Sequence, residues 1–406
     1  MRKFIYKFLD GLKDDSKFSI FEVIIIILIA IIFGIIVGCF LTYNKKSNTI
    51  YRDDKLDEII NTYNSIKDNY YIDVDDDLLV NGAVSGMTEV LNDNYSNFMG
   101  DEATEDFNRS VNGSFVGIGA SVSYNGEYNR IVKVNNNGPA YKAGLRVNDI
   151  ILSIDGKDTK NIYGSELNKL VDGKKDSIVK IKIKRGNDTK TFSVKRKLIE
   201  IESATSNIFN EKNNIIGYID VDIIATNTYK QFESNLDKLE KNNIDSLIID
   251  LRDNPGGHLS QTNEILSLFF NRKTVLYQIK NKNKIKKIYS LDNNKRKYPV
   301  AIIVNGGSAS AAEIITACFR DNYKNSIVVG TNTYGKGSIQ RTIELSTGAS
   351  LKYTTELWLT PKGKSINKIG INPDVGVEQG QDYLLNPSFD NDLQLKKAIT
   401  LLTKKD

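Results

Sequence analysis

The sequence contains very little of the two residue types on which many catalytic and structural sites depend. Its 406 residues include only two cysteines and one histidine. A zinc site needs about four His, Cys or carboxylate ligands, and only Cys39, Cys318 and His258 could supply nitrogen or sulfur. Two cysteines cannot form a disulfide framework. A metal centre is therefore not expected, and any Ser-His-Asp mechanism would have to use His258.

A large excess of charge of one sign is also missing. The sequence has 55 Lys and Arg against 50 Asp and Glu, a net charge of +5. Nucleic-acid-binding proteins concentrate positive charge on one face, so no nucleic-acid partner is expected. Hydrophobic residues make up 40% and charged residues 26%, which is typical of globular proteins. A chain of this length predicts two or three domains.

One long uncharged run is present near the N-terminus. Val23–Leu41 contains nineteen residues without a charged side chain, between Glu22 and Lys45. As a helix it would be about 28 Å long, close to the hydrocarbon thickness of a bilayer. A cleaved signal peptide has a shorter apolar core and a small-residue cleavage site, which this run lacks. We predict a transmembrane anchor. A buried core helix is one alternative; the other is a lipid anchor on Cys39, where residues 36–39 resemble a lipoprotein cleavage box.

The expected topology is a single pass through the cell membrane. Basic residues both precede and follow the run, so the positive-inside bias is slight. A lone N-terminal span usually exports the large domain that follows it. We therefore expect residues 1–22 in the cytoplasm, the anchor at 23–41, and the catalytic part of the chain outside the cytoplasm.

Four regions follow the anchor and indicate a multidomain α/β protein. Residues 44–100 carry apolar side chains at helical spacing, which predicts two or three amphipathic helices for packing or for forming a homo-oligomer. Residues 101–197 contain short alternating runs typical of strands. Residues 198–380 alternate strands with helices, which indicates a mostly parallel sheet with covered faces. Residues 381–406 are interpreted as a loop and a final helix.

Three motifs occur in order in the strand-rich region. Phe-Val-Gly-Ile-Gly-Ala at 115–120 is followed by Gly-Pro-Ala-x-x-Ala-Gly-Leu and then by Asn-Asp-Ile-Ile-Leu-Ser-Ile-Asp-Gly. Together they resemble a bacterial PDZ domain. The resemblance implies that backbone N–H groups of the first motif hold a peptide's terminal carboxylate while the peptide adds a strand. The residues concerned are Val116, Gly117, Ile118 and Gly119. A small β-domain whose glycines serve only turns is the alternative.

Three loops of the α/β region follow predicted parallel strands. Their sequences are Arg-Asp-Asn-Pro-Gly-Gly-His at 252–258, Asn-Gly-Gly-Ser-Ala-Ser-Ala-Ala-Glu at 305–313 and Thr-Tyr-Gly-Lys-Gly at 333–337. Ligand-handling groups of open α/β sheets gather beyond the carboxyl ends of the strands. We therefore expect the three loops to meet at one edge of the sheet.

Ser310 lies where the second loop becomes a helix, a place suited to a nucleophile. Unpaired N–H groups at a helix N-terminus favour developing negative charge, so the Ala311 amide can donate to an oxyanion. The Pro-Gly-Gly turn of the first loop can bring a second donor close. Lys336 could be the base if apolar neighbours such as Tyr334 desolvate it, because an ordinary lysine has a pKa of about 10.4. Gln340 would share a strand face with Lys336 and could orient its amine.

Each of these residues also has a simpler interpretation. Ser308 and Ser310 are suited to capping a helix. Lys336 could be a solvated loop lysine, and the Pro-Gly turn could be purely structural. His258 is interpreted as an ordinary histidine at the surface or at the edge of the core. The combination of motifs is more specific than any single residue.

The three loops resemble the motifs of the C-terminal processing peptidases, also called tail-specific proteases. In that family a membrane or signal segment, a helical region, an embedded PDZ domain and a crotonase-like α/β peptidase core occur in this order. The resemblance covers roughly residues 50–400. It implies that Ser310 is the nucleophile, Lys336 the general base and Gln340 the third member of the site.

The same resemblance assigns the oxyanion hole to the region of Gly257 and Ala311 and matches residues 92–99 to the end of the helical region. Ala312 stands where the family often has a further serine, a position that is not the nucleophile. The implied function is a membrane-anchored serine endopeptidase that cuts extracytoplasmic proteins captured by their free C-termini, with no metal or nucleotide cofactor. The alternatives are an inactive PDZ adaptor and a crotonase-type enzyme acting on acyl-CoA.

Overall fold

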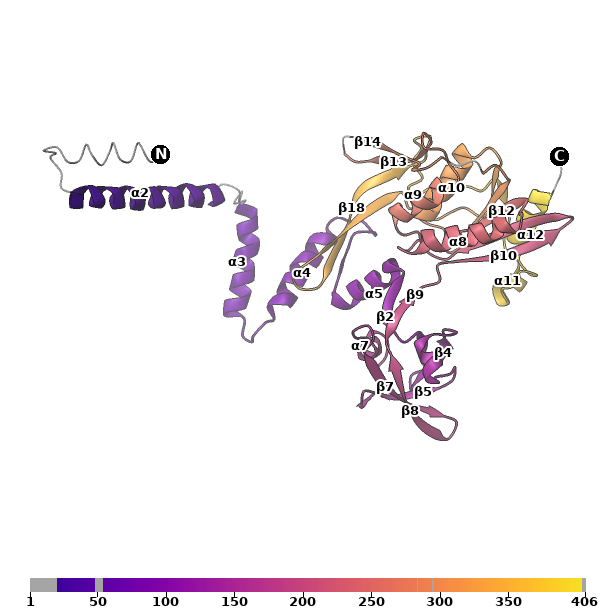
Figure 1. Ribbon diagram of the computed structural model, residues 1–406, viewed down its shortest axis with the longest axis horizontal. Helices are drawn as coiled ribbons and strands as arrows, with labels where there is room; N and C mark the ends of the chain where they lie inside the picture. Colours follow the sequence, from indigo (N-terminus) through magenta and orange to yellow (C-terminus); the bar gives the residue numbers. More distant parts are fainter. Residues whose placement is uncertain (1–19, 48–53, 283, 294–295, 404–406) are drawn as a thin grey trace. The chain divides into compact units, whose positions relative to one another are not determined.

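A computed structural model describes residues 20–47, 54–282, 284–293 and 296–403 (Figure 1). The predicted cytoplasmic segment 1–22 lies outside the described residues, except for its last three. The chain divides into two compact units, which end at Leu79 and Asp406.

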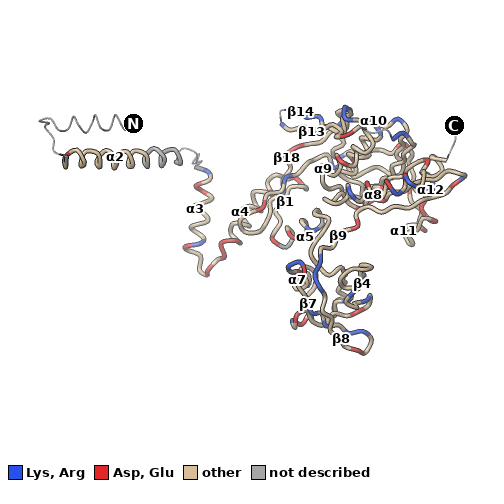
Figure 2. Tube along the Cα trace, viewed as in Figure 1, with Lys and Arg blue, Asp and Glu red and all other residues tan. Residues whose placement is uncertain are grey.

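The first unit is helical. Helix α2 (Ile20–Ser47) carries no Lys, Arg, Asp or Glu between Glu22 and Gly38 (Figure 2). The segment Phe21–Gly38 has a mean hydropathy of 3.1 and is not buried. Among the described residues, α2 is the one helix that is long and apolar enough to cross a membrane. Helix α3 (Asp54–Asn69) ends before a break, and α4 (Asp76–Glu89) then continues into the second unit. Helices α3 and α4 agree with the two or three helices predicted for residues 44–100.

The strand-rich region is a β-domain with two short helices. Its elements are β2 (Ser114–Gly117), β3 (Ala120–Tyr124), β4 (Asn129–Val134), α6 (Pro139–Ala143), β5 (Ile150–Ile154), β6 (Lys157–Asp158), α7 (Ser165–Val171), β7 (Ile178–Arg185), β8 (Asp188–Lys195) and β9 (Lys197–Glu200). One sheet has the order β3-β4-β5-β7-β8, so β3 is an edge strand, and β2 pairs separately with β9. In β7, Val179, Ile181 and Ile183 are fully buried while the lysines between them are exposed, as strand alternation requires.

The α/β region is built on a six-stranded sheet. In spatial order its strands are β10 (Ala204–Glu211), β11 (Asn214–Val221), β12 (Ser246–Asp250), β15 (Val300–Val304), β16 (Ser326–Gly330) and β19 (Val375–Gly376). The β10–β11 pair is antiparallel and the remaining pairs are parallel. The mostly parallel sheet predicted from the sequence is therefore confirmed.

Helices cover both faces of this sheet. Helices α8 (Thr228–Lys241), α9 (Leu259–Ser267) and α10 (Ala311–Asn322) contribute to one hydrophobic cluster, and α12 (Leu393–Thr403) contributes to another. Every residue of β12 and β15 is buried, because a central parallel strand has a packed layer on each side.

A second sheet joins segments that are far apart in the sequence. Its order is β1 (Asn97–Met99), β18 (Ser350–Leu359), β13 (Val275–Lys280) and β14 (Ile285–Tyr289), and β17 (Ser338–Glu344) also pairs with β18. Figure 1 shows β13, β14 and β18 side by side. The sequence analysis did not predict β1 or the β13–β14 hairpin. The short β1 has three residues, and the largely exposed β14 has two lysines among five residues.

Two further helices complete the described chain. Helix α5 (Asp101–Asn112) lies between β1 and β2, and α11 (Gln381–Leu385) precedes α12. The turn after α5 is bonded to the start of α8, where the Asn227 side-chain amide donates to the Gly113 carbonyl at 2.8 Å. A loop and a final helix at the C-terminus agree with the sequence prediction, with α11 as an additional short helix.

Candidate active site

The three loops after β12, β15 and β16 are bonded to one another at one edge of the six-stranded sheet. The Ala309 amide donates to the Asn254 carbonyl at 2.9 Å, which joins the first loop to the second. The Tyr334 amide donates to the Ser308 carbonyl at 3.0 Å, which joins the third loop to the second. The convergence predicted from the strand order is therefore confirmed.

The two serines of the second loop have different surroundings. Ser308 is fully buried; its hydroxyl donates to the Leu251 carbonyl at 2.7 Å and accepts from the Asn305 amide at 2.9 Å. Ser310 is partly exposed and precedes α10 with φ 54° and ψ −113°. This conformation is unfavourable for a residue with a Cβ atom. Ser308 therefore fixes the loop, whereas Ser310 is presented at the start of the helix.

The glycine turn of the first loop lies directly against Ser310. Gly256 has φ +95°, and a Cβ atom there would lie 2.8 Å from both the Ala311 nitrogen and the Ser310 Cβ. Gly257 has φ +145°, and a Cβ atom there would lie 2.0 Å from the Ile224 carbonyl oxygen. Among the described residues, the amides of Gly257 and Ala311 donate to no protein acceptor. Both predicted oxyanion donors thus have a free N–H group.

Glu313, in the first turn of α10, ties the second loop to the third. Its side chain is fully buried and accepts hydrogen bonds from three amides at 2.8 Å each, those of Ser310, Gly335 and Lys336. The Thr333 hydroxyl donates a fourth bond at 2.6 Å. Burial raises the pKa of the Glu313 carboxyl, and the four donors act in the opposite direction. Sequence reasoning missed Glu313, although Ser310-x-x-Glu313 has the spacing of a capping box.

The Lys336 amine is half-buried beside residues of the second sheet. Its Nζ lies 5.0 Å from the centre of the Tyr95 ring, which belongs to the segment before β1. Burial is the main cause that lowers the pKa of Lys336, and Lys352 lowers it further. The carboxylates of Asp93 and Glu313 act in the opposite direction. A lowered pKa is what a lysine base requires.

The aromatic neighbour of Lys336 differs from the one expected. The sequence predicted that Tyr334 would desolvate the amine, but the Tyr334 side chain is 57% exposed. The Tyr95 ring lies beside the amine instead. Burial is the main cause that raises the pKa of Tyr95 to about 12.

Gln340 belongs to a polar chain on β17 and β18. Its Nε2 donates to the Ser338 hydroxyl at 2.8 Å and to the Thr354 hydroxyl at 3.1 Å, and Thr354 donates to Asp93 at 2.5 Å. Among the side chains that the structure describes, no hydrogen bond joins Ser310, Lys336 and Gln340 to one another. The loops carrying Ser310 and Lys336 are joined through Glu313. The hydrogen bonds expected between the described side chains of Ser310, Lys336 and Gln340 are not formed.

The His258 ring forms its hydrogen bond with a residue outside the three loops. Its Nε2–H donates to the Val111 carbonyl at 3.0 Å, because a carbonyl can only accept. His258 also precedes α9, where its own amide donates to Ile224. This agrees with the interpretation of His258 as a histidine at the edge of the core.

The predicted carboxylate-binding motif is split between a strand and a turn. Val116 and Gly117 lie in β2, paired with Leu198 and Lys197 of β9. Ile118 is buried, and its carbonyl accepts from the Ala140 amide at 2.8 Å. The following Gly119 has φ +72° and leads into the edge strand β3. Strand addition requires an exposed sheet edge, and β3 is at the edge of its sheet.

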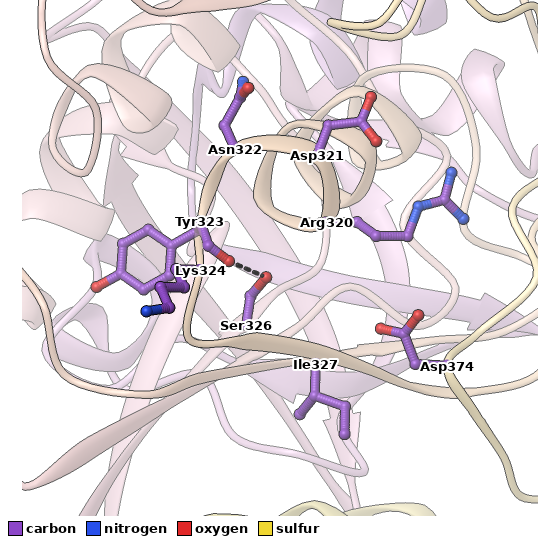
Figure 3. A pocket seen from close by; sticks show the side chains of 8 residues that line it. All are labelled: Arg320, Asp321, Asn322, Tyr323, Lys324, Ser326, Ile327 and Asp374. Carbon is purple, nitrogen blue, oxygen red and sulfur yellow. Dashed lines mark hydrogen bonds between the residues drawn. The ribbon is translucent and has the colours of Figure 1, made fainter.

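A cavity of about 530 Å³ lies at the opposite end of α10 from Ser310 (Figure 3). Its lining residues are Arg320, Asp321, Asn322, Tyr323, Lys324, Ser326, Ile327 and Asp374. They come from the C-terminal end of α10, the start of β16 and the segment before β19. This cavity has no contact with the three loops and is not assigned to the active site.

Three parts of the chain match known protein families. Residues 215–377 match peptidase family S41, and residues 116–195 match the PDZ domain. Residues 41–104 match the N-terminal domain of the activating protease CtpB. The fold and these matches define a serine-type endopeptidase with an embedded PDZ domain.

Named relatives match most of the chain. Carboxy-terminal processing protease CtpA of Bacillus subtilis (strain 168) is 35% identical over 350 residues, which are 86% of this chain and 74% of that protein. CtpB of the same organism is 36% identical over 354 residues, 86% and 72% of the two chains. A solved structure, the photosystem II D1 C-terminal processing protease, is 26% identical with a TM-score of 0.48, covering 77% of this chain and 85% of that one. The chain belongs to the carboxy-terminal processing proteases, as its motifs predicted, and neither alternative function has support.

Proposed function

We propose that the chain is a membrane-anchored serine endopeptidase in which Ser310 is the nucleophile and Lys336 its general base. One observation carries this assignment. The buried Glu313 carboxylate holds the amides of both residues at 2.8 Å, which fixes their main chains next to each other. The lowered pKa of Lys336 and the strained presentation of Ser310 support the same roles.

The proposed reaction proceeds through an acyl-enzyme. The Ser310 hydroxyl attacks the carbonyl carbon of the scissile bond while the Lys336 amine accepts its proton, and the amides of Gly257 and Ala311 donate to the oxyanion. The leaving amine then takes the proton from Lys336 as the C–N bond breaks. Water attacks the ester with Lys336 again as base, which releases Ser310. No metal or nucleotide takes part in these steps.

Substrate binding has to complete the site. The Lys336 amine lies over the Tyr95 ring, and Gln340 is bonded to Thr354. For catalysis the amine has to reach the Ser310 hydroxyl, with Gln340 as the group that would orient it. Catalytic hydrogen bonds often tighten only when substrate is bound, so this movement is part of the proposal.

We propose that the PDZ domain captures the free C-terminus of a protein or peptide substrate. The tail would add a strand to the exposed edge of β3, and amides of residues 116–119 would bind its carboxylate. Val116 and Gly117 already pair with β9, so Ile118 and Gly119 are the better placed of the four. Capture raises the concentration of the tail near Ser310.

The apolar helix α2 supports the proposal of a membrane anchor at residues 23–41, with the catalytic part outside the cytoplasm. Lipidation of Cys39 would anchor the chain to the same membrane. The helical region 44–100 is the proposed site of a homo-oligomer contact. We also propose that the PDZ domain begins at residue 101, the peptidase core at residue 198 and the C-terminal tail at residue 381.

Comparative analysis of protein C-termini tests the proposed function. Cells that produce wild-type enzyme should accumulate new C-termini that are missing in cells producing Ser310→Ala. The same termini in both strains would contradict it. Protease treatment of intact cells with the wall removed should digest residues 44–406; digestion only after lysis would reverse the topology.

A further inference from the structure

A second lysine lies on the face of the second sheet that also carries Gln340 and Thr354. Lys352 is in β18, directly paired with Asn97 of β1 on one side and with Thr342 of β17 on the other. Paired residues in an antiparallel sheet point to the same face, as do residues two apart along a strand. Lys352 therefore shares its face with Thr354 and with Gln340, which is bonded to Thr354.

The Lys352 side chain is held away from bulk water. It is half-buried, and its Nζ lies 5.1 Å from the centre of the Phe107 ring of α5. Among the side chains that the structure describes, no carboxylate forms an ion pair with Lys352. Burial lowers the pKa of this amine. Its charge is therefore not neutralised by a described partner.

Groups of both signs surround the Lys336 amine. They are Asp93 and Tyr95 before β1, Glu313 of α10, Tyr334 of the same loop and Lys352 of β18. The two carboxylates favour the protonated amine. Lys352 acts against them, and its effect on the pKa of Lys336 exceeds that of either carboxylate taken alone.

We propose that Lys352 is a positioning residue for catalysis, whose positive charge favours the neutral form of the Lys336 amine, the form that can accept the Ser310 proton. Both lysines are half-buried, and Lys352 pairs with Asn97, two residues from Tyr95, whose ring lies beside the Lys336 amine. Positive charges held on neighbouring residues away from bulk water repel each other, so one of them releases its proton more readily. The two lysines titrate as a coupled pair. The inference rests on the proposed role of Lys336 as the base.

The direction in which the pKa of Lys336 should change follows from these charges. When the Lys352 charge is removed, the carboxylates of Asp93 and Glu313 are no longer opposed, so the pKa of Lys336 rises. In the pH range where kcat/KM rises with pH, a smaller fraction of the enzyme then has a neutral base at any given pH. The ascending limb of kcat/KM against pH moves to higher pH, by about one pH unit, while the plateau at high pH stays the same.

The decisive experiment measures the protonation of Lys336 without using activity. Trace acylation with acetic anhydride over a range of pH, followed by peptide mass spectrometry, gives the midpoint at which the Lys336 amine becomes reactive. It is carried out on the full chain in the Ser310→Ala background. The variants are Lys352→Met, which keeps the aliphatic contact with Phe107, and Lys352→Arg, which keeps the charge. Lys287→Met, an exposed lysine of β14, is the matched control for losing one charge.

Lys352→Met is expected to raise the Lys336 midpoint by about one pH unit, whereas Lys352→Arg and Lys287→Met leave it near the wild-type value. An equal midpoint in Lys352→Met and wild type overturns the inference. If Lys352→Met fails to fold, Lys352→Gln provides the test, because it also removes the charge and keeps a long side chain. Its Lys336 midpoint should rise as well, and an unchanged midpoint overturns the inference.

The failure of this inference is distinguishable from the failure of the proposed function. An unchanged Lys336 midpoint in Lys352→Met, with Lys336→Ala still inactive, removes the role of Lys352 and keeps the Ser310–Lys336 mechanism. Full activity of Lys336→Ala removes the mechanism itself, whatever the midpoint of the amine.

Discussion

The two halves of the proposed active site are built in different ways. The nucleophile half consists of main-chain groups held by buried neighbours: Asn254, Gly256, Ser308 and Ala311 are all buried. The base half consists of side chains from three separate segments: Lys336 from a loop, Thr354 and Lys352 from β18, and Asp93 and Tyr95 from before β1. Main-chain groups of this kind are fixed by folding, whereas side chains can change partners.

This difference assigns a different task to each half. The proposed oxyanion donors are held in place, because a Cβ atom at Gly256 or Gly257 would meet main-chain atoms and neither glycine can shift freely. The Lys336 amine is over an aromatic ring and has no hydrogen bond to Ser310 among the described residues. We therefore expect the nucleophile half to be preformed and the base half to be completed by substrate.

The sharpest test of the base half compares Lys336 with His258. Lys336→Ala should lower kcat/KM by about 10³-fold or more, because the nucleophile loses its proton acceptor. His258→Ala should remain close to wild type, because its ring is bonded only to the Val111 carbonyl among the described residues. Steady-state kinetics would measure both. If His258→Ala were inactive and Lys336→Ala remained active, the mechanism would be a conventional Ser-His-Asp triad.

The nucleophile half can be disturbed through one glycine. Gly257→Ala would place a Cβ atom 2.0 Å from the Ile224 oxygen, so the turn must move and one oxyanion donor is lost. We expect kcat to fall by about 10²–10³-fold. Gly86→Ala in α4 is the matched control, because its Cβ would meet nothing within 4 Å. Near-normal kcat in Gly257→Ala would show that this amide does not bind the oxyanion.

The carboxylate that joins the two halves should matter for both stability and rate. In Glu313→Gln an NH₂ group would face amide donors that now bond to a carboxylate oxygen. We expect the free energy of unfolding to fall by about 2–4 kcal/mol, with kcat reduced about tenfold or more in the folded enzyme. Denaturant unfolding and kinetics would measure the two effects. The exposed Glu344→Gln should change neither, and wild-type behaviour of Glu313→Gln would break the proposed link.

The smallest effect concerns substrate capture at a distance from both halves. One peptide with a free and with an amidated C-terminus should differ about tenfold in kcat/KM below saturation, because the amide loses charge-assisted bonds to the turn at residues 118–119. A competition assay with the two uncleaved tails would measure binding directly. Equal rates for both peptides would show that the carboxylate is not recognised.

The nucleophile half could be predicted from sequence because its signals are local. Fully apolar strands followed by Gly-rich loops set the parallel sheet, and the strand order brings the loops together. Ser310 and its helix are then adjacent in the chain. Glu313, three residues later, was within reach of the same reasoning through its capping-box spacing.

The surroundings of Lys336 could not be predicted in the same way, although the sequence pointed to Lys336 itself. The Asp93–Thr354 bond joins residues 261 positions apart, and it depends on the three-residue strand β1 pairing with β18. Neither a period nor a motif signals such a pairing. The covering of Lys336 by Tyr95 and the approach of Lys352 follow from it, so the sequence pointed to Tyr334 instead.

Mapping the adduct of a fluorophosphonate probe by mass spectrometry tests the central claim most directly. Such a probe reacts with a serine hydroxyl only when a neighbouring base activates it. The Ser310–Lys336 mechanism predicts one adduct, on Ser310, in the wild-type enzyme and its loss in folded Lys336→Ala. An adduct on Ser308, or undiminished labelling of Ser310 in Lys336→Ala, would contradict the mechanism.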